Sequence, residues 1–360
     1  MPVVFDSLFL SILRKSVGIP IEFHNVSVKE IESVWREAQK QAVDGIVINE
    51  VVMLESSFHN MQSFHNLKLR LIASVLLLDK YNECANSRVK KLTSFFRKGG
   101  YRSCVLKGQG VALLYPNPKR RRCGDIDLWV DGERDEMVNF IRSKGVKVYD
   151  VHLVHATADF FEEVPVEIHF RPSWMYNPIL DRKLQKFFAE QASEQFANYD
   201  KSVGFAYPTI YFNLVHSMVH INRHIFEEGI GLRQLMDYYY ILQHSIQQER
   251  NDAYRVLCSV GLKKFVGAVM YVLKQIFLLE YDLMLCEPNS VLGQHLLDII
   301  IVGGNFGKAF GLKHGRNKLE KGLLQWKHNL QLMLPYANEA MWIPAFQVWH
   351  YLWRKRKGYL

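Results

Sequence analysis

Apolar residues recur at intervals of three and four between Ser7 and Lys98, which is the spacing of one face of a helix. Two runs show it clearly: Val28, Ile31, Val34 and Trp35, and then Leu67, Leu71, Val75 and Leu78. Little strand-like alternation interrupts them. The pattern predicts an N-terminal helical region over residues 1–98.

The pattern changes after Gly99 and Gly100 to short segments of period two, separated by turn residues. SCVLKG and CGDIDLWV are typical of strands, and QGVALLY between them is typical of a helix. A helix is predicted over 133–143 and strands over 146–151, 152–160 and 164–170, before Pro172 ends the sheet region. These segments predict an α/β core over residues 99–172.

Helical spacing returns over residues 173–360, with clear segments at 209–224 and 232–244 and a Trp-rich helix at the end. The expected fold class is therefore α+β: a small mixed-sheet core flanked by N-terminal and C-terminal helical regions. With 49% hydrophobic residues, the 360-residue chain can bury more than one core, which excludes disorder.

The charge and the cysteine content indicate which partners and which cellular setting to expect. Lys and Arg number 45 against 36 Asp and Glu, and the formal net charge of +9 favours a polyanionic partner: a nucleotide, a nucleic acid or an anionic membrane surface. The five cysteines form no C-x-x-C pair and favour a reducing, cytoplasmic setting. Charged residues interrupt every apolar run before about 20 residues, so no membrane span is expected.

Three acids on two predicted strands are the candidate catalytic residues. In GDIDLWV the period of a strand places Asp125 and Asp127 on one face. At an effective dielectric near 20, such charges about 4 Å apart repel by roughly 4 kcal/mol, so a cation is expected between them. In VPVEIHFR the same alternation offers Glu167 as a third ligand, and hard oxygen donors select Mg²⁺, or Mn²⁺. Such a clamp can activate an attacking hydroxyl and neutralise a triphosphate.

A triphosphate also needs positive groups and hydrogen-bond donors. Lys107, Gly108 and Gln109 stand between a predicted strand and a helix start, where backbone N–H groups favour an anion. The basic run from Lys119 to Arg122, just before the acid pair, either grips phosphate oxygens or forms a solvated loop.

Three segments together carry a resemblance to a known family: VLKGQGVALLYPNPKRRRCGDIDLWV, VEIHFR and GIGLRQLMDYYYIL. They resemble the DNA polymerase β nucleotidyltransferase superfamily, and most closely its branch of uncharacterised bacterial nucleotidyltransferases. The likeness extends roughly from Leu67 to Leu273.

Carried over residue by residue, the resemblance implies that Asp125, Asp127 and Glu167 bind the catalytic metal ions. It also implies that Gly108 is the glycine of the phosphate turn and that Arg121 is the arginine found before the acid pair in this branch. Most of the superfamily has Gly-Ser or Gly-Gly in this turn, whereas this chain has glycine followed by glutamine.

Other polar residues have two interpretations each. His169 and Arg171 share the face of Glu167 and either contact substrate or form a partly exposed strand face. Arg233 and Asp237, in the third segment of the resemblance, either face the nucleotide cleft or form an i, i+4 ion pair.

Two helical stripes are also left with alternatives. His216, His220 and His224 recur every four residues and form either a second metal site, for zinc, or a polar seam. A C-terminal stripe of Trp342, Phe346, Trp349 and Trp353 ends in the basic run 354–357. This helix either packs on its own helical domain or binds a partner, RNA or anionic lipid.

The leading hypothesis is an Mg²⁺-dependent enzyme that transfers a nucleoside monophosphate from a nucleoside triphosphate to a hydroxyl of a small-molecule or protein acceptor, releasing pyrophosphate. A second hypothesis takes RNA, such as a tRNA end, as the acceptor, and only the basic charge supports it. The third is a catalytically silent nucleotide-binding scaffold, which the presence of all three acids argues against.

Overall fold

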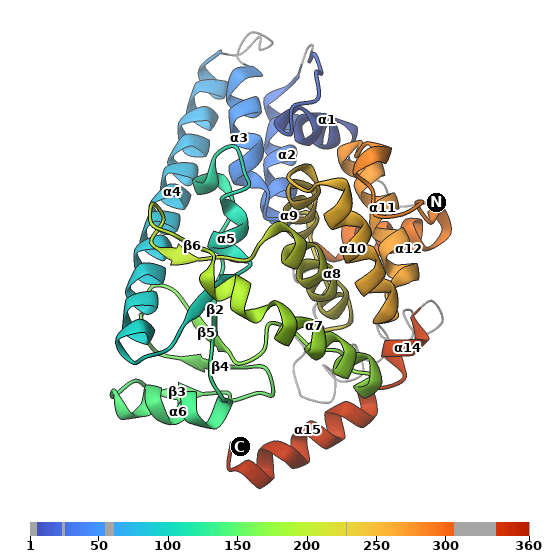
Figure 1. The fold of residues 1–360 in the computed structure, drawn as a ribbon. Coiled ribbons are helices and arrows are strands. Elements are labelled where there is room, and N and C mark those ends of the chain that lie inside the picture. Colours follow the sequence, from blue (N-terminus) through green and yellow to red (C-terminus); the bar gives the residue numbers. More distant parts are fainter. Residues whose placement is uncertain (1–5, 24–25, 55–60, 228, 306–335, 360) are drawn as a thin grey trace.

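The computed structural model describes residues 6–23, 26–54, 61–227, 229–305 and 336–359. A seven-stranded mixed sheet lies between helices from the N-terminal and C-terminal parts of the chain (Figure 1). This is the α+β fold that the hydrophobic pattern predicts. The domain boundaries at residues 98 and 172 stay a prediction.

The N-terminal region is helical, as predicted. Its helices are α1 (Ser7–Ser16), α2 (Val28–Lys40), α3 (Asp44–Met53) and α4 (Met61–Lys98). Side-chain caps define where two of them begin: Asp6 accepts the first free N–H groups of α1, and Ser27 forms a capping box with Glu30 in α2.

The sheet has the strand order β3-β4-β5-β2-β1-β7-β6. Its strands are β1 (Ser103–Leu106), β2 (Ile126–Val130), β3 (Val148–Tyr149), β4 (His155–Ala158), β5 (Val166–His169), β6 (Tyr199–Asp200) and β7 (Phe205–Ala206). The central strand β2 runs antiparallel to β1 and parallel to β5. The prediction that Pro172 ends the sheet region is wrong, because β7 pairs with β1 beyond it. Strands of two residues are too short to show a period-two pattern.

Short helices connect the first strands, a longer helix lies between β5 and β6, and the remaining helices of the C-terminal region follow β7. Between strands lie α5 (Gly108–Ala112), the 3₁₀ turn η2 (Pro118–Arg120) and α6 (Arg134–Ser143). The C-terminal region has α7 (Pro178–Ala197), α8 (Ile210–Glu227), α9 (Leu232–Gln243), α10 (Gln247–Ser259), α11 (Lys263–Phe277), η3 (Tyr281–Leu283), α12 (Ser290–Gly303), α14 (Ala337–Ala340) and α15 (Ile343–Lys357). Across the described part of the chain, none of the helices has the length and apolar character needed to cross a bilayer.

The sheet separates two apolar cores. On one face Ile126 and Leu128 of β2 and Ile168 of β5 pack in the cluster that includes side chains of α4 and α6. On the other face Trp129 joins the core of the C-terminal helices, with its ring centroid 4.4 Å from that of Phe196. The polar side chains of that second face therefore lie between the sheet and the helical region.

The C-terminal helix α15 packs against the α/β core as well as the helical region, and Figure 1 shows it running from α14 toward α6. Phe346 stacks on Trp174 with ring centroids 4.3 Å apart, and the Arg134 guanidinium lies 4.5 Å from the Trp353 ring. Trp349 is about half exposed. The predicted aromatic stripe is thus only partly covered.

A buried acid near α15 predicts a pH dependence of stability. Glu339 accepts the backbone N–H of Tyr176 at 2.7 Å, and burial raises the pKa of Glu339 from 4.5 to about 7. Between these pH values the folded protein holds a proton that the unfolded chain has lost, so stability falls as pH rises through this window. Glu339→Gln keeps a carbonyl acceptor and should raise the free energy of unfolding at neutral pH and above by roughly 3 kcal/mol.

Urea unfolding at a series of pH values checks this expectation. The gain should vanish below pH 4.5, where the Glu339 carboxyl is protonated in both states. A gain that is independent of pH would show that burial of the ionised carboxylate is not its cause.

Candidate active site

Strand pairing brings the three acids together. Asp127 lies directly opposite Glu167 in the parallel β2–β5 pair, and Asp125 stands two residues earlier, just before β2 begins. One carboxylate oxygen from each of the three lies within 4.8 Å of the others. Acids from two separate strands therefore converge, as the alternation in both strands predicts.

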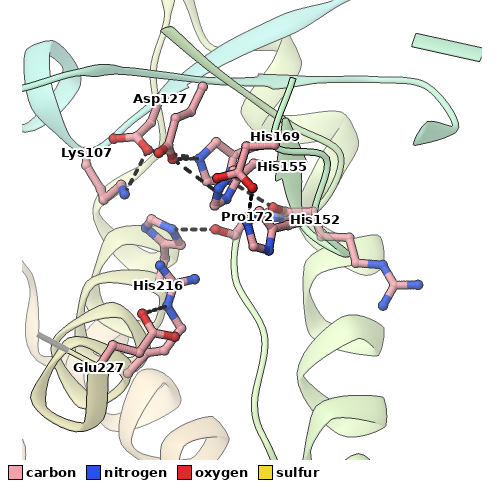
Figure 2. A network of polar contacts seen from close by, with 12 residues as sticks. Lys107, Asp127, His152, His155, His169, Pro172, His216 and Glu227 are labelled. Carbon is pink, nitrogen blue, oxygen red and sulfur yellow. Dashed lines mark hydrogen bonds and ion pairs between the residues drawn. The ribbon is translucent and has the colours of Figure 1, made fainter. Parts of the chain in front are cut away.

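The charges of this group are balanced within the fold. Asp127 is buried, and its Oδ1 lies 2.9 Å from Lys107 Nζ and 2.9 Å from His169 Nε2 (Figure 2). Burial opposes ionisation, but Lys107 and His169 outweigh it and hold the pKa of Asp127 below its usual range. Burial likewise opposes ionisation of Glu167, yet the hydrogen bond from His169 lowers its pKa to about 2.

Asp125 is the one acid of the three whose ionised form is disfavoured by its surroundings. The negative charge of Asp127 and burial raise the pKa of Asp125 to about 6. Such a shift arises when carboxylates are placed side by side without enough positive charge between them. The donor set of three carboxylates therefore fits a hard divalent cation such as Mg²⁺.

The turn between β1 and α5 lies next to the acids. Lys107 and Gly108 have φ values of 49° and 33°, in the left-handed region. Gly110, which the sequence did not single out, is needed for close packing: a Cβ there would stand 2.9 Å from the Val105 carbonyl oxygen and 3.0 Å from Tyr207 Cβ. These glycines allow the chain to turn tightly at the edge of the site.

Each side chain of the basic run pairs with an acid on a helix. The pairs are Lys119 with Glu83, Arg120 with Asp79, Arg121 with Asp237, and Arg122 with Asp44. The Arg121 pair is bidentate and buried, with both nitrogen–oxygen distances 2.7 Å, and the Tyr115 hydroxyl donates to the same carboxylate at 2.6 Å. The run thus ties the loop before the acids to α3, α4 and α9, and Asp237 pairs with Arg121 rather than with Arg233.

A cavity of about 910 Å³ opens onto the acids, within the range of roughly 300–1,000 Å³ that is usual for ligand sites. Asp125, Asp127 and Glu167 line it together with Lys107 and Gly108. Helices from the C-terminal region supply much of the wall, with His220, His224 and Glu227 from α8, Arg233 and Asp237 from α9, and Phe346, His350 and Arg354 from α15. Residues of the segment 150–155, including His155, line the cavity as well.

Three other residues that the sequence predicts to contact nucleotide or substrate lie at different places relative to the cavity. Arg233 lines the cavity and donates from Nη1 to the carbonyl of Arg122 at 3.1 Å. Gln109 is buried and does not line it. Arg171 follows the end of β5 and does not line the cavity. Its Nη1 lies 3.9 Å from Oδ2 of Asp181 in α7. Of these three residues, only Arg233 lines the cavity.

The histidine row of α8 is a polar seam. His216 is buried and donates from Nε2 to the carbonyl of Pro172 at 3.1 Å (Figure 2). Burial lowers the pKa of His216 to about 3. Within the described residues, His216, His220 and His224 do not form a group with the geometry of metal ligands, so the fold favours the polar seam of the two alternatives.

A different histidine, His155, lies beside the acids and was missed by the sequence reasoning. It stands opposite His169 in the antiparallel β4–β5 pair, and its Nδ1 is 3.7 Å from Glu167 Oε2. The alternation in HATA places His155 on the face away from Ala156. The alternation therefore gives the face of His155, but it does not show that His169 lies opposite on the next strand.

Comparison with known proteins agrees with this geometry. A family model described as an uncharacterised nucleotidyltransferase matches residues 27–278. No curated protein matches the chain significantly. Since the family match spans most of the chain, with the sheet and the acids inside it, the protein belongs to this family of uncharacterised nucleotidyltransferases.

Proposed function

We propose that the protein is an Mg²⁺-dependent enzyme that transfers a nucleoside monophosphate from a nucleoside triphosphate to a hydroxyl of a small-molecule or protein acceptor. The observation that supports this most is the register of Asp127 with Glu167, which places two carboxylates beside Asp125. The adjoining cavity is large enough for a nucleotide and borders the Gly108 turn.

In this proposal Asp125, Asp127 and Glu167 would hold divalent metal ions, which would supply a lower pKa for the acceptor hydroxyl and positive charge against the phosphates. Lys107 and Arg233 face the same cavity and provide positive charge for phosphate oxygens. Glu167 is ionised at neutral pH and accepts the hydrogen bond of the attacking hydroxyl. A bond forms from the acceptor oxygen to the α-phosphorus as the hydroxyl proton passes to Glu167, the bond from that phosphorus to the bridging oxygen breaks, and pyrophosphate leaves.

The walls of the cavity favour a compact acceptor. Side chains of α8, α9 and α15 line the same space as the acids, so acceptor and nucleotide share about 910 Å³. Such a space accommodates a small molecule or a single protein side chain beside the nucleotide. The acceptor hydroxyl would enter beside Glu167, opposite the Gly108 turn.

Label transfer tests the proposal. The purified protein is incubated with each α-labelled nucleoside triphosphate, Mg²⁺ and fractionated cell extract as the source of acceptors. Label should enter one acceptor fraction with equimolar release of pyrophosphate, and a chelator should abolish both until Mg²⁺ is restored. Protein with Asp125→Asn, prepared in parallel, controls for contaminating enzymes. Label transfer that is insensitive to chelation or to this substitution would contradict the proposal, and label found in the RNA fraction would change the acceptor.

A further inference from the structure

A second group of ligand-type side chains lies beside the acids: His155, Glu167 and His169 each offer one ligand atom, and these atoms lie within 4.8 Å of one another. Figure 2 shows the two histidine rings next to Asp127. We propose that this group binds a divalent transition-metal ion of the Zn²⁺ type, at a site that is separate from the carboxylate site and shares Glu167 with it.

The sheet itself fixes the three side chains. His155 and His169 are directly opposite each other in the antiparallel β4–β5 pair, with ring centroids 5.2 Å apart. Glu167 precedes His169 by two residues on the same strand and so shares its face. Because hydrogen-bonded strands hold all three, the group is organised before any ion arrives.

The distances between the ligand atoms suit a small ion. Glu167 Oε2 lies 3.5 Å from His169 Nε2 and 3.7 Å from His155 Nδ1. With bonds of about 2.0–2.1 Å, two ligands of a tetrahedral ion stand roughly 3.3–3.4 Å apart. Both distances from the carboxylate are within a few tenths of an ångström of that separation, and all three ligand atoms lie within 4.8 Å of one another.

The His169 ring is oriented as a metal-bound imidazole usually is. His169 Nδ1 lies 3.3 Å from the Arg171 carbonyl oxygen, so its N–H donates there and Nε2 points at the carboxylates. A metal-bound imidazole commonly donates its other N–H to a backbone carbonyl in this way. The buried Nδ1 of His155 has no hydrogen-bond partner in the described part of the chain. A bound ion would satisfy that nitrogen and take the place of the Nε2 proton of His169.

The donor types indicate which ion would bind. Two imidazoles and one carboxylate suit zinc and the neighbouring first-row divalent ions. Mg²⁺ prefers oxygen ligands and dehydrates reluctantly, so it should stay at Asp125 and Asp127. The two sites are therefore distinguishable by metal and by residue.

Binding of Co²⁺, a spectroscopic probe for Zn²⁺ sites, tests the proposal on the full-length protein after metal removal. We expect one Co²⁺ per chain with visible absorption that persists in excess Mg²⁺. His155→Gln should weaken this binding by about 100-fold or more, because it removes a ligand rather than an outer contact. Two control variants should retain it: Asp125→Asn, which alters only the carboxylate site, and His152→Gln, whose ring is 5.3 Å from that of His155 but outside the group.

Two results would overturn the proposal: no Co²⁺ binding, or binding that Mg²⁺ displaces and that Asp125→Asn abolishes while His155→Gln does not. If His155→Gln fails to fold by circular dichroism, X-ray absorption of the Co²⁺-loaded wild-type protein decides instead. Scattering from two imidazoles is expected, and oxygen-only coordination refutes the site. These readouts need no nucleotide, so a failure of label transfer would leave them unaffected.

Discussion

Replacing Asp125 with Asn is expected to lower the rate of nucleotide transfer by at least about a thousandfold while raising the melting temperature of the metal-free protein. In the proposed mechanism activity falls because the metal would lose a charged ligand and the triphosphate charge would be less well neutralised. Stability rises because Asp127 and burial raise the pKa of Asp125 to about 6. At higher pH the ionised carboxylate therefore opposes folding until a cation binds.

Steady-state rates and thermal melts with and without Mg²⁺ measure both effects. Mg²⁺ should raise the melting temperature of the wild-type protein and have little effect on Asp125→Asn. Asp131→Asn is the matched control, because Asp131 follows β2 but is exposed and paired with Arg102. A wild-type rate in Asp125→Asn would remove this residue from the catalytic group, and a collapsed melting temperature would assign it a structural role.

Asp127 differs from Asp125 in its surroundings, so its replacement should affect stability in the opposite direction. Asp127→Ala would remove the carboxylate that Lys107 and His169 both contact at 2.9 Å. A buried cation left without its partner is destabilising. A loss of activity in Asp127→Ala could therefore come from a damaged fold as well as from lost catalysis, which makes Asp125→Asn the clearer test of catalysis.

Asp237→Ala should reduce the free energy of unfolding by about 3–5 kcal/mol, the cost of leaving a buried charge uncompensated. Arg121 and Asp237 form a buried, bidentate ion pair, and the Tyr115 hydroxyl donates to the same carboxylate. The pair joins the loop before the acids to α9. Loss of the pair should therefore also loosen α9, which contributes Arg233 to the wall of the cavity.

Urea denaturation measures this effect. The double variant Arg121→Met with Asp237→Leu should recover part of the loss, because it removes both charges and fills the space with apolar groups. Asp131→Asn, which breaks the exposed pair with Arg102, should cost no more than about 1 kcal/mol. If Asp237→Ala costs equally little but abolishes activity, Asp237 acts on substrate rather than on the fold.

The local spacing of apolar and polar residues was enough to predict the helices and the faces on which the acids lie. The alternation in GDIDLWV placed Asp127 on the face opposite Ile126 and Leu128, and the structure confirms it. The same reasoning correctly assigned Glu167 to the polar face of β5 and predicted the helices on both sides of the sheet. Such inferences hold because the direction of a side chain depends on the dihedral angles of its own segment, which the chain pattern reflects.

Pairing between distant segments was decided only by the tertiary structure. The opposition of Asp127 to Glu167 and of His155 to His169 depends on strand register, and a slip of one residue would turn a side chain to the other face. The pair of Arg121 with Asp237 joins residues 116 positions apart. Register and long-range pairs follow from how whole surfaces pack, because burial of both cores selects one alignment among many that the local pattern allows.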